Sequence, residues 1–323
     1  MSDLKTSTPT SHLTSAEASL SIAGSLGQLL VMVLDINPNQ TFFTKHPKAL
    51  LQWLDASLAL ANSHIMLHPN NDVAFVGAHA SGCSFLYAGP QSGGDGGAAA
   101  NASRQRDGQF EGFYAVEAAV RGKVAEILSR ESATNAPINS DSRLSGALSM
   151  ALAFVNRRRS ESPLQEGAQA RILAMSASGD TASQYMNYMN VFFSAQKMAV
   201  SIDNCMLDID SGLLQQGADI TGGIYRRVQQ KHFPSLLQFL IWIFLPDKSL
   251  REGLSLPSAE RVDYHAACFC HRNLIDVGFV CSVCLSIFCK YSPICTTCHT
   301  VFKNPGPLPL PKKKKVATPA KAN

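Results

Sequence analysis

The chain has 323 residues, of which 46% are hydrophobic and 16% are charged. This composition excludes collagen-like, coiled-coil and wholly disordered proteins, and it allows one large domain together with a smaller one. The longest unbroken apolar run, Phe239 to Leu245, is far shorter than the roughly 20 residues of a membrane-spanning helix. Because residues 1–21 are also polar, we expect a soluble, unsecreted protein with no membrane contact.

The net charge of +4 is unevenly distributed along the chain. Asp276 is the last acidic residue and seven lysines follow it, whereas the residues before it carry a small excess of acidic groups. Basic surface is therefore confined to the C-terminal end. This distribution argues against an extended face for nucleic acid or anionic membrane on the main domain.

Strands and helices alternate over some two thirds of the chain. Residues 29–36 begin the pattern with a continuous apolar run, as in a strand buried on both faces. The elements predicted after it are a helix over 47–62, strands over 72–77 and 82–88, helices over 113–128 and 144–155, a strand over 170–177, a helix over 184–197, a strand over 199–206, a short helix over 211–217, a strand over 222–228 and a helix over 236–245. Because parallel strands need crossover connections, this order predicts an α/β fold with a doubly wound, mostly parallel sheet.

Changes in composition divide the chain into segments. Glycine, serine and other small polar residues predict mobile loops, while prolines and charges predict linkers and tails. The predicted divisions are a disordered N-terminus at 1–27, an α/β domain at 28–247 with mobile loops at 89–112 and 129–143, a linker at 248–261, a zinc-binding module at 262–303 and a disordered basic tail at 304–323.

The helix predicted over 236–245 is apolar on all sides and includes Trp242. Such a helix must be covered by other atoms. The sequence leaves two coverings open: the protein's own sheet and neighbouring helix, or a groove of a partner protein.

Nine cysteines are present, and seven of them lie between Cys268 and Cys298. The other two, Cys83 and Cys205, stand beside strand-like apolar residues and are predicted to be core residues. Without a secretion signal the compartment is expected to be reducing, which favours metal binding over disulfides for the clustered cysteines.

Two C-x2-C pairs form the strongest motif of the sequence. The pairs are Cys281 with Cys284 and Cys295 with Cys298. Each pair presents two thiolates from one tight turn, and four thiolates bind Zn²⁺ in a tetrahedron at about 2.3 Å each. Because four protein ligands leave no open position, this zinc site is predicted to be structural rather than catalytic.

A second zinc site is possible upstream of these pairs. Its candidate ligands are Cys268, Cys270, His271 and Cys289, and His299 is also in reach along the sequence. C-x-C is a less common spacing for zinc ligands, so cysteines without a metal remain the alternative for this group.

A candidate magnesium loop follows the first predicted strand. Asp35, Asn37 and Asn39 stand at the carboxyl end of that strand, and Asp180 follows a later strand. Two amides in place of hydroxyls, together with the stiff Pro38, argue against a working cation site. The alternative roles are a turn-capping acid for Asp35 and a helix N-cap for Asp180.

No dinucleotide-binding glycine motif, phosphate-binding loop or nucleophile elbow occurs in the sequence. We therefore predict neither catalytic residues nor a small-molecule substrate. The lysine run of the C-terminal tail has the form of a nuclear localisation signal, which predicts a nuclear protein. Its residues are Lys312, Lys313, Lys314 and Lys315.

Several longer stretches resemble one family closely. They are QQGADITGGIY, PSLLQFLIWIFLPD and YHAACFCHRNLIDVGFVCSVCLSIFCKYSPICTTC, followed by the lysine tail. The family is that of the smaller von Willebrand factor A-domain subunits of the general transcription and DNA-repair factor TFIIH, and the resemblance covers roughly residues 28–303. It implies a von Willebrand A-like domain followed by a C4-type zinc finger on Cys281, Cys284, Cys295 and Cys298.

The resemblance also implies a function. Such a subunit is a non-catalytic structural member of the TFIIH core, acting in nucleotide excision repair and RNA polymerase II initiation. The implied partners are other core subunits, chiefly the larger one that also combines an A-like domain with zinc modules, and the association with DNA is indirect. The cation motif of A domains, D-x-S-x-S, is not matched because Asn37 and Asn39 replace its serines.

Two other functions are weighed against this one. A RING-like zinc protein that assists ubiquitin transfer would need eight interleaved metal ligands. A sequence-specific DNA-binding protein would need basic side chains among the zinc-binding cysteines, yet Lys290 is the only basic residue between Cys281 and Cys298.

Overall fold

The computed structural model divides the chain into two compact units, Met1–Tyr264 and His265–Asn323. It describes residues 27–89, 109–133, 142–161, 169–180, 184–257, 262, 264, 266–271, 274–284 and 286–302. The N-terminal segment, most of the two predicted mobile loops and the tail with its lysine run lie outside these residues. Residues 109–112 and 129–133 of the predicted loops are described and belong to helix α5 (Gln109–Ala133), which therefore extends beyond both of its predicted ends.

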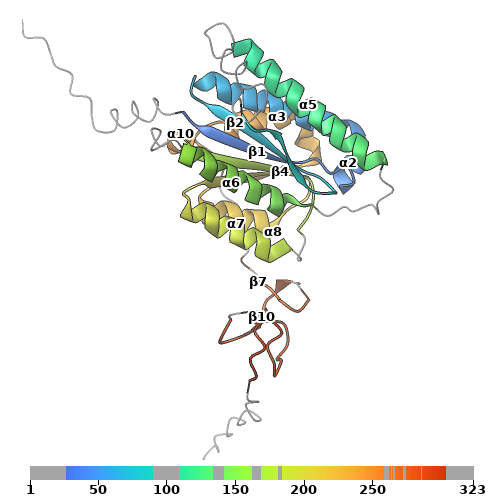
Figure 1. Ribbon diagram of the computed structural model, residues 1–323, viewed down its shortest axis with the longest axis vertical. Coiled ribbons are helices and arrows are strands. Elements are labelled where there is room, and N and C mark those ends of the chain that lie inside the picture. Colours follow the sequence, from blue (N-terminus) through green and yellow to red (C-terminus); the bar gives the residue numbers. More distant parts are fainter. Residues whose placement is uncertain are drawn as a thin grey trace, which may run out of the picture. The chain divides into compact units, whose positions relative to one another are not determined.

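The first unit is built on a six-stranded sheet in the order β3-β2-β1-β4-β5-β6 (Figure 1). The strands are β1 (Leu29–Asp35), β2 (Asp72–Ala78), β3 (Cys83–Tyr87), β4 (Ala170–Ser176), β5 (Ser201–Leu207) and β6 (Tyr225–Val228). Every neighbouring pair is parallel except β2 and β3, which are antiparallel. The predicted doubly wound, mostly parallel sheet is confirmed.

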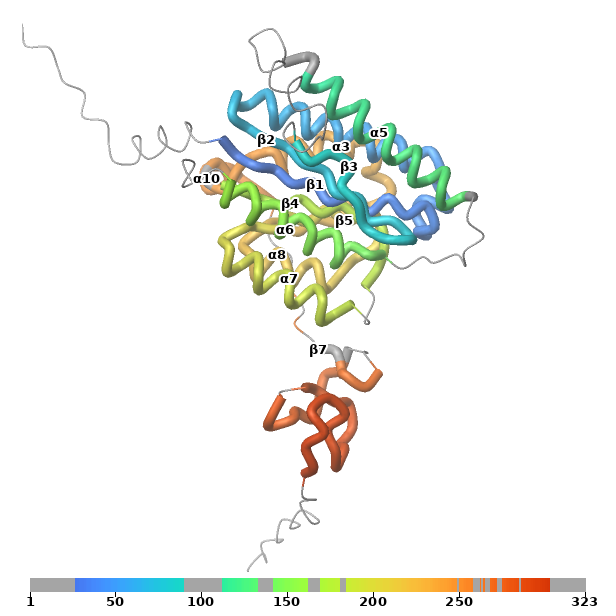
Figure 2. Tube along the Cα trace, viewed as in Figure 1, coloured from blue at the N-terminus to red at the C-terminus, as the bar shows by residue number. Residues whose placement is uncertain are grey.

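Helices cover both faces of this sheet, and β1 shows why. Leu30, Met32 and Leu34 belong to one hydrophobic cluster, while Val31 and Val33 belong to another. Successive side chains of a strand point to opposite faces, so an unbroken apolar run needs a layer on each side. One layer contains α2 (Thr41–Lys45), α3 (Pro47–Leu67) and α5, and the other contains α6 (Leu144–Glu161), α7 (Tyr185–Lys197) and α8 (Gly212–Thr221) (Figure 2).

The connection from α8 to β6 differs from the prediction. The helix runs to Thr221, four residues further than expected, and Gly222 ends it with a left-handed φ of 69°. At Gly223 a Cβ atom would lie 2.0 Å from the carbonyl oxygen of Ile202, so only glycine fits against β5 there. These two glycines keep the chain out of the sheet until Tyr225.

The apolar segment predicted as one helix is three short pieces. They are a 3-10 helix, η3 (Gln230–Ser235), an α-helical turn, α9 (Leu236–Phe239), and a π-helical turn, η4 (Leu240–Phe244). Leu240 and Phe244 pack into the cluster beside α3, which confirms that the protein's own core covers this side. The other side is open, because Trp242 is 68% exposed.

Two arginines bind the end of the first unit to the sheet. Arg171, on β4, donates hydrogen bonds to the carbonyl oxygens of three successive residues at 2.6 to 2.8 Å, namely Phe244, Leu245 and Pro246. Arg251 ends the short helix α10 (Lys248–Arg251) and binds both carboxylate oxygens of Asp203, at 2.9 and 2.6 Å. The first residues of the segment predicted as a linker therefore pack against the domain.

The second unit contains two small antiparallel ladders. Strand β7 (Ala266–Ala267) pairs with β8 (Leu274–Ile275), and β9 (Phe279–Val280) pairs with β10 (Ile287–Phe288). Among its described residues, the buried hydrophobic cluster consists only of Cys281, Phe288 and Cys295, with a few partly buried neighbours. Domains of about 40 residues rarely fold on so small a core without a metal or disulfides.

Within the described part of the chain, no helix has the length and hydrophobicity needed to cross a membrane.

Candidate metal centre

Two knuckles of the same design present the four cysteines of the main zinc prediction. In the first, the backbone N–H of Cys281 donates to the carbonyl oxygen of Ser286 at 2.9 Å. In the second, the N–H of Cys295 donates to the carbonyl of Thr300, also at 2.9 Å. Each hydrogen bond closes a tight turn that holds both sulfurs of a C-x2-C pair on one side.

The sulfurs of the two knuckles face one another at distances that suit the corners of a tetrahedron. The Sγ atoms of Cys281 and Cys298 are 3.7 Å apart, and those of Cys284 and Cys295 are 3.6 Å apart. All four sulfurs lie within 4.8 Å of one another. A tetrahedron of Zn–S bonds of about 2.3 Å has sulfur–sulfur edges of about 3.8 Å, so the donor set fits zinc in both chemistry and size.

Hydroxyl groups beside the sulfurs favour the thiolate form that a metal needs. Ser286 places its Oγ 3.1 Å from the sulfur of Cys284, and with the Ser286 backbone N–H it lowers the pKa of that thiol to about 6. Thr300 places its Oγ1 3.1 Å from the sulfur of Cys298 and lowers the pKa of that thiol in the same way. Hydrogen bonds donated to a charged sulfur stabilise it, so these two cysteines are prepared for metal binding.

These two hydroxyl residues are not among the predicted site residues, although the sequence contains a signal for them. Both knuckles follow the pattern C-x2-C-x-[S/T], with Ser286 and Thr300 each two positions after the second cysteine. This short repeat accounts for the matching hydrogen bonds of the two halves.

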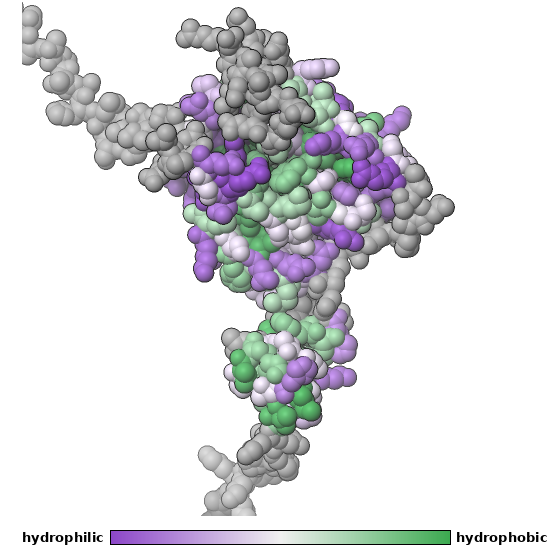
Figure 3. All heavy atoms as spheres, in the orientation of Figure 1, coloured by the Kyte–Doolittle hydropathy of each residue, from purple (hydrophilic) through white to green (hydrophobic). Residues whose placement is uncertain are grey.

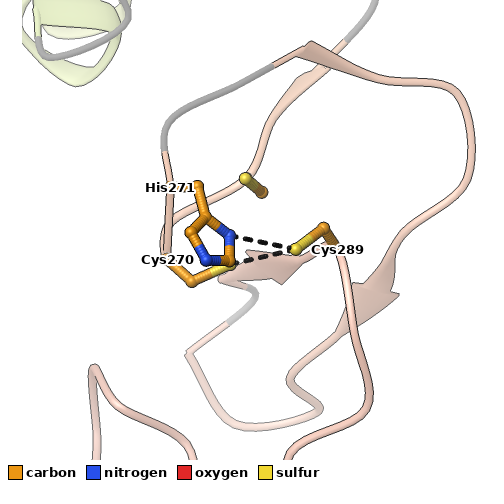
Figure 4. A group of neighbouring side chains, drawn as sticks. Cys270, His271 and Cys289 are labelled. Atoms are coloured by element: carbon orange, nitrogen blue, oxygen red, sulfur yellow. Dashed lines mark hydrogen bonds between the residues drawn. The ribbon is translucent and has the colours of Figure 1, made fainter.

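The structure also brings together the residues of the possible second site. The ligand atoms of Cys268, Cys270, His271 and Cys289 all lie within 4.8 Å of one another. Figure 4 shows Cys270 and His271 directed at Cys289, whose sulfur is 3.4 Å from the Cys270 sulfur and 3.2 Å from His271 Nδ1. His299 belongs to neither of the two groups found among the described residues.

Side chains of the candidate magnesium loop make hydrogen bonds within the protein. Asp35 is fully buried, and its Oδ2 accepts hydrogen bonds from the hydroxyls of Ser176, at 2.8 Å, and Ser178, at 3.1 Å. Burial raises the pKa of the Asp35 carboxyl, and the hydrogen bonds from neighbouring serines offset only part of that rise. Asn37 Oδ1 accepts from the backbone N–H of Asn39 at 3.0 Å.

Asp180, the other acid of that prediction, lies at the start of α8. Its Oδ2 accepts from the backbone N–H of Leu213 at 3.1 Å, and its Oδ1 accepts from Ser211 Oγ. Asp180 therefore caps a helix, although not the one that directly follows it in sequence. That the Asp35 loop is not a working cation site stays a prediction.

The two isolated cysteines lie in the first unit and belong to neither metal group. Cys205 is fully buried in β5, and burial raises the pKa of its thiol to about 12, which confirms a core role. Cys83 is half-buried at the start of β3 and donates from its sulfur to the carbonyl oxygen of Arg143 at 3.3 Å.

Comparison with known proteins gives consistent matches for both units. The family model described as transcription factor Tfb4 matches residues 27–299. The general transcription and DNA repair factor IIH subunit tfb4 of Schizosaccharomyces pombe is 35% identical over 85% of this chain and 88% of its own. The subunit TFB4 of Arabidopsis thaliana is likewise 35% identical, over the same shares of the two chains. These names give no support to the ubiquitin-transfer alternative.

Among solved structures, the N-terminal domain of TFIIH p34 matches with a TM-score of 0.55 at 25% sequence identity. The match covers 69% of this chain and the whole of that domain. Its extent agrees with the first unit, whose sheet is doubly wound and mostly parallel as predicted. With a family model across nearly the whole described chain and relatives above 30% identity, the protein belongs to the Tfb4 family of subunits of the general transcription and DNA repair factor IIH.

Proposed function

We propose that the chain is a non-catalytic structural subunit of the TFIIH core that acts in nucleotide excision repair and in RNA polymerase II initiation by holding other subunits. The observation that carries this proposal is the family match, which runs from β1 through the second knuckle and so includes both units. Affinity purification of the tagged full-length protein, followed by mass spectrometry, tests it directly. Recovery of the other TFIIH core subunits is expected, and their consistent absence would refute the proposal.

The four-cysteine site of the second unit is proposed to bind a structural Zn²⁺ through Cys281, Cys284, Cys295 and Cys298. The near-tetrahedral sulfur distances and the very small apolar core of the module support this proposal. A zinc chelator is therefore expected to unfold the module while the α/β domain stays folded. Hydrogen exchange measures both at once: protection over 279–302 should disappear on chelation, and protection of β1 should persist. Unchanged protection in the module would contradict a structural metal.

The principal partner is proposed to be the larger TFIIH subunit that also combines an A-like domain with zinc modules. In this proposal the α/β domain binds that subunit's C-terminal zinc module, and the chain's own module adds a second contact. Apolar side chains on the surface of the second unit support the second contact (Figure 3). Phe279, Val280 and Tyr291 line a groove of about 300 Å³ there, and the rings of Phe279 and Tyr291 meet edge to face at 6.2 Å.

Co-expression with the larger subunit separates these two contacts. A chain truncated after Tyr264 is expected to bind detectably but more weakly than the full-length chain. Phe279→Ser in the full-length chain should weaken binding in the same direction while leaving its zinc content unchanged. As a matched control, Tyr114→Ser removes an aromatic side chain that is 74% exposed on α5, and it should bind normally. Binding of 265–323 alone at full strength, with none by the truncated chain, would show that the α/β domain has been assigned the wrong role.

Nuclear localisation is proposed on the lysine run at 312–315, in the tail outside the described residues. Replacing all four lysines with alanine is expected to reduce nuclear import of a reporter fused to the tail. An unchanged nuclear fraction would remove this role from the tail, while import of the whole protein with its complex would stay open to a separate test.

A further inference from the structure

The group formed by Cys268, Cys270, His271 and Cys289 has an arrangement that packing does not explain. The side chains of Cys270 and His271 are exposed and that of Cys289 is half-buried, so only Cys268 is buried. Free cysteines are usually buried as small hydrophobic residues. Exposed thiols and an imidazole that converge from distant parts of the chain are instead typical of a metal site.

Backbone contacts fix this group from two directions. The N–H of Phe269 donates to the carbonyl oxygen of Ile287 at 2.7 Å, which ties the segment 268–271 to strand β10. Cys289 follows β10 directly, so the same strand delivers it to the other three side chains. The ligand atoms of the four residues thus meet within 4.8 Å although 18 positions separate His271 from Cys289.

The donor set determines the class of metal. Three thiolates and one imidazole nitrogen, Nδ1 of His271, form a complete tetrahedral set of soft and borderline ligands, which suits Zn²⁺ and excludes Mg²⁺ and Ca²⁺. We propose that the module binds a second zinc ion through Cys268, Cys270, His271 Nδ1 and Cys289. The inference deepens the proposed function, since it assumes that the four-cysteine site also holds zinc.

The two ligand sets alternate along the chain. Cys268, Cys270 and His271 come first, the pair Cys281 and Cys284 of the other site comes next, then Cys289, and finally the pair Cys295 and Cys298. Strand β10 lies between Cys284 and Cys289, so one short strand connects the two sites. In this arrangement the two ions clamp one hairpin from both of its ends and replace the large apolar core that the module lacks.

Metal analysis of the full-length protein tests the inference. The protein as purified is expected to carry two zinc ions per chain. His271→Ala should lower that number to one or fewer, whereas His271→Cys, which restores a fourth soft ligand, should keep two. Cys83→Ser serves as the control, because Cys83 belongs to the first unit, and it should also keep two. Substitution with Co²⁺ should give the absorption of two different sites, one with four sulfurs and one with three sulfurs and one nitrogen.

The outcomes distinguish the second site from the first. One zinc per chain that is lost in Cys284→Ser but retained in Cys289→Ser would overturn the second site and leave the four-cysteine site intact. Two zinc ions that persist in His271→Ala would also overturn the ligand set proposed here. A protein without zinc would refute both sites.

Discussion

Replacing Arg251 with alanine is expected to destabilise the α/β domain severely, even though Arg251 lies beyond the last strand of the sheet. Arg251 donates to both carboxylate oxygens of Asp203, and the two side chains are only 9% and 1% exposed. Without the guanidinium, Asp203 would keep just one of its observed donors, the backbone N–H of Ile224 at 2.8 Å. The buried carboxylate would then lose its ion-pair partner and keep only the longer-range attraction to the Arg171 guanidinium.

The size of the effect follows from that burial. Removing one partner of a buried ion pair costs about 3–5 kcal/mol, because the remaining charge stays desolvated. For a domain of this size each kcal/mol lowers the melting temperature by about 2–4 °C, so we expect a decrease of roughly 10 °C. Thermal unfolding followed by circular dichroism measures it. Arg130→Ala is the matched control, since its ion pair with Glu126 is about two-thirds exposed and should contribute less than about 1 kcal/mol.

A second substitution separates charge from packing. Adding Asp203→Asn to Arg251→Ala removes the buried carboxylate that has lost its ion pair and keeps an acceptor for the Ile224 N–H, so the double variant should be more stable than Arg251→Ala alone. A melting temperature of Arg251→Ala that matches the Arg130→Ala control would refute the reasoning. A double variant less stable than Arg251→Ala would show that lost packing, rather than the buried charge, dominates.

Three further predictions concern other positions of the α/β domain. Gly223→Ala should lower the free energy of unfolding by about 1–3 kcal/mol, because the new Cβ meets the carbonyl of Ile202. Gly122→Ala should raise it by about 0.5–1 kcal/mol, because Gly122 lies inside α5 with open space around it. Denaturant titration compares the two variants. Burial lowers the pKa of His64 from 6.5 to about 4, so between these pH values only the unfolded chain takes up the proton. Acidification from pH 6.5 to pH 4 should therefore reduce the free energy of unfolding by up to about 3 kcal/mol. Thermal melts across that range should show the loss in the wild-type protein and not in His64→Gln. Burial raises the pKa of the Asp35 carboxyl, so the folded state loses stability as the pH rises above the ordinary value near 3.8. Asp35→Asn should therefore raise the melting temperature at pH 7 but not at pH 4. Mg²⁺ should not shift the melting temperature of the wild-type protein or of Asp35→Asn.

Much of the α/β fold was predictable from the sequence because its strands are buried on both faces. The apolar run of β1 and the alternation of strands with helices determined the fold class. The segment 230–244 was not predictable in the same way, since an apolar run does not distinguish an α-helix from 3-10 and π turns. That choice depends on distant contacts, such as the three carbonyl oxygens held by Arg171.

The residues of the candidate metal centre were likewise only partly predictable from the sequence. Spacing alone pairs Cys281 with Cys284 and Cys295 with Cys298, because a C-x2-C turn is local. The second group stays undecided in the sequence, since the partner of the 268–271 segment is Cys289 at the far end of β10, and only the fold brings that residue into reach. Likewise, the serines that bind Asp35 lie at the end of β4 and just after it, and β4 is beside β1 in the sheet but distant in sequence.

The alternating order of the two ligand sets has a mechanical consequence. With both proposed ions bound, the loop closed by the ion on Cys268, Cys270, His271 and Cys289 contains Cys281 and Cys284, and the loop closed by the ion on the four cysteines contains Cys289. The two loops therefore overlap along the chain, and force applied after Cys298 reaches Cys298 and Cys295 before Cys289. Such force can unfold the module only by breaking metal–sulfur bonds.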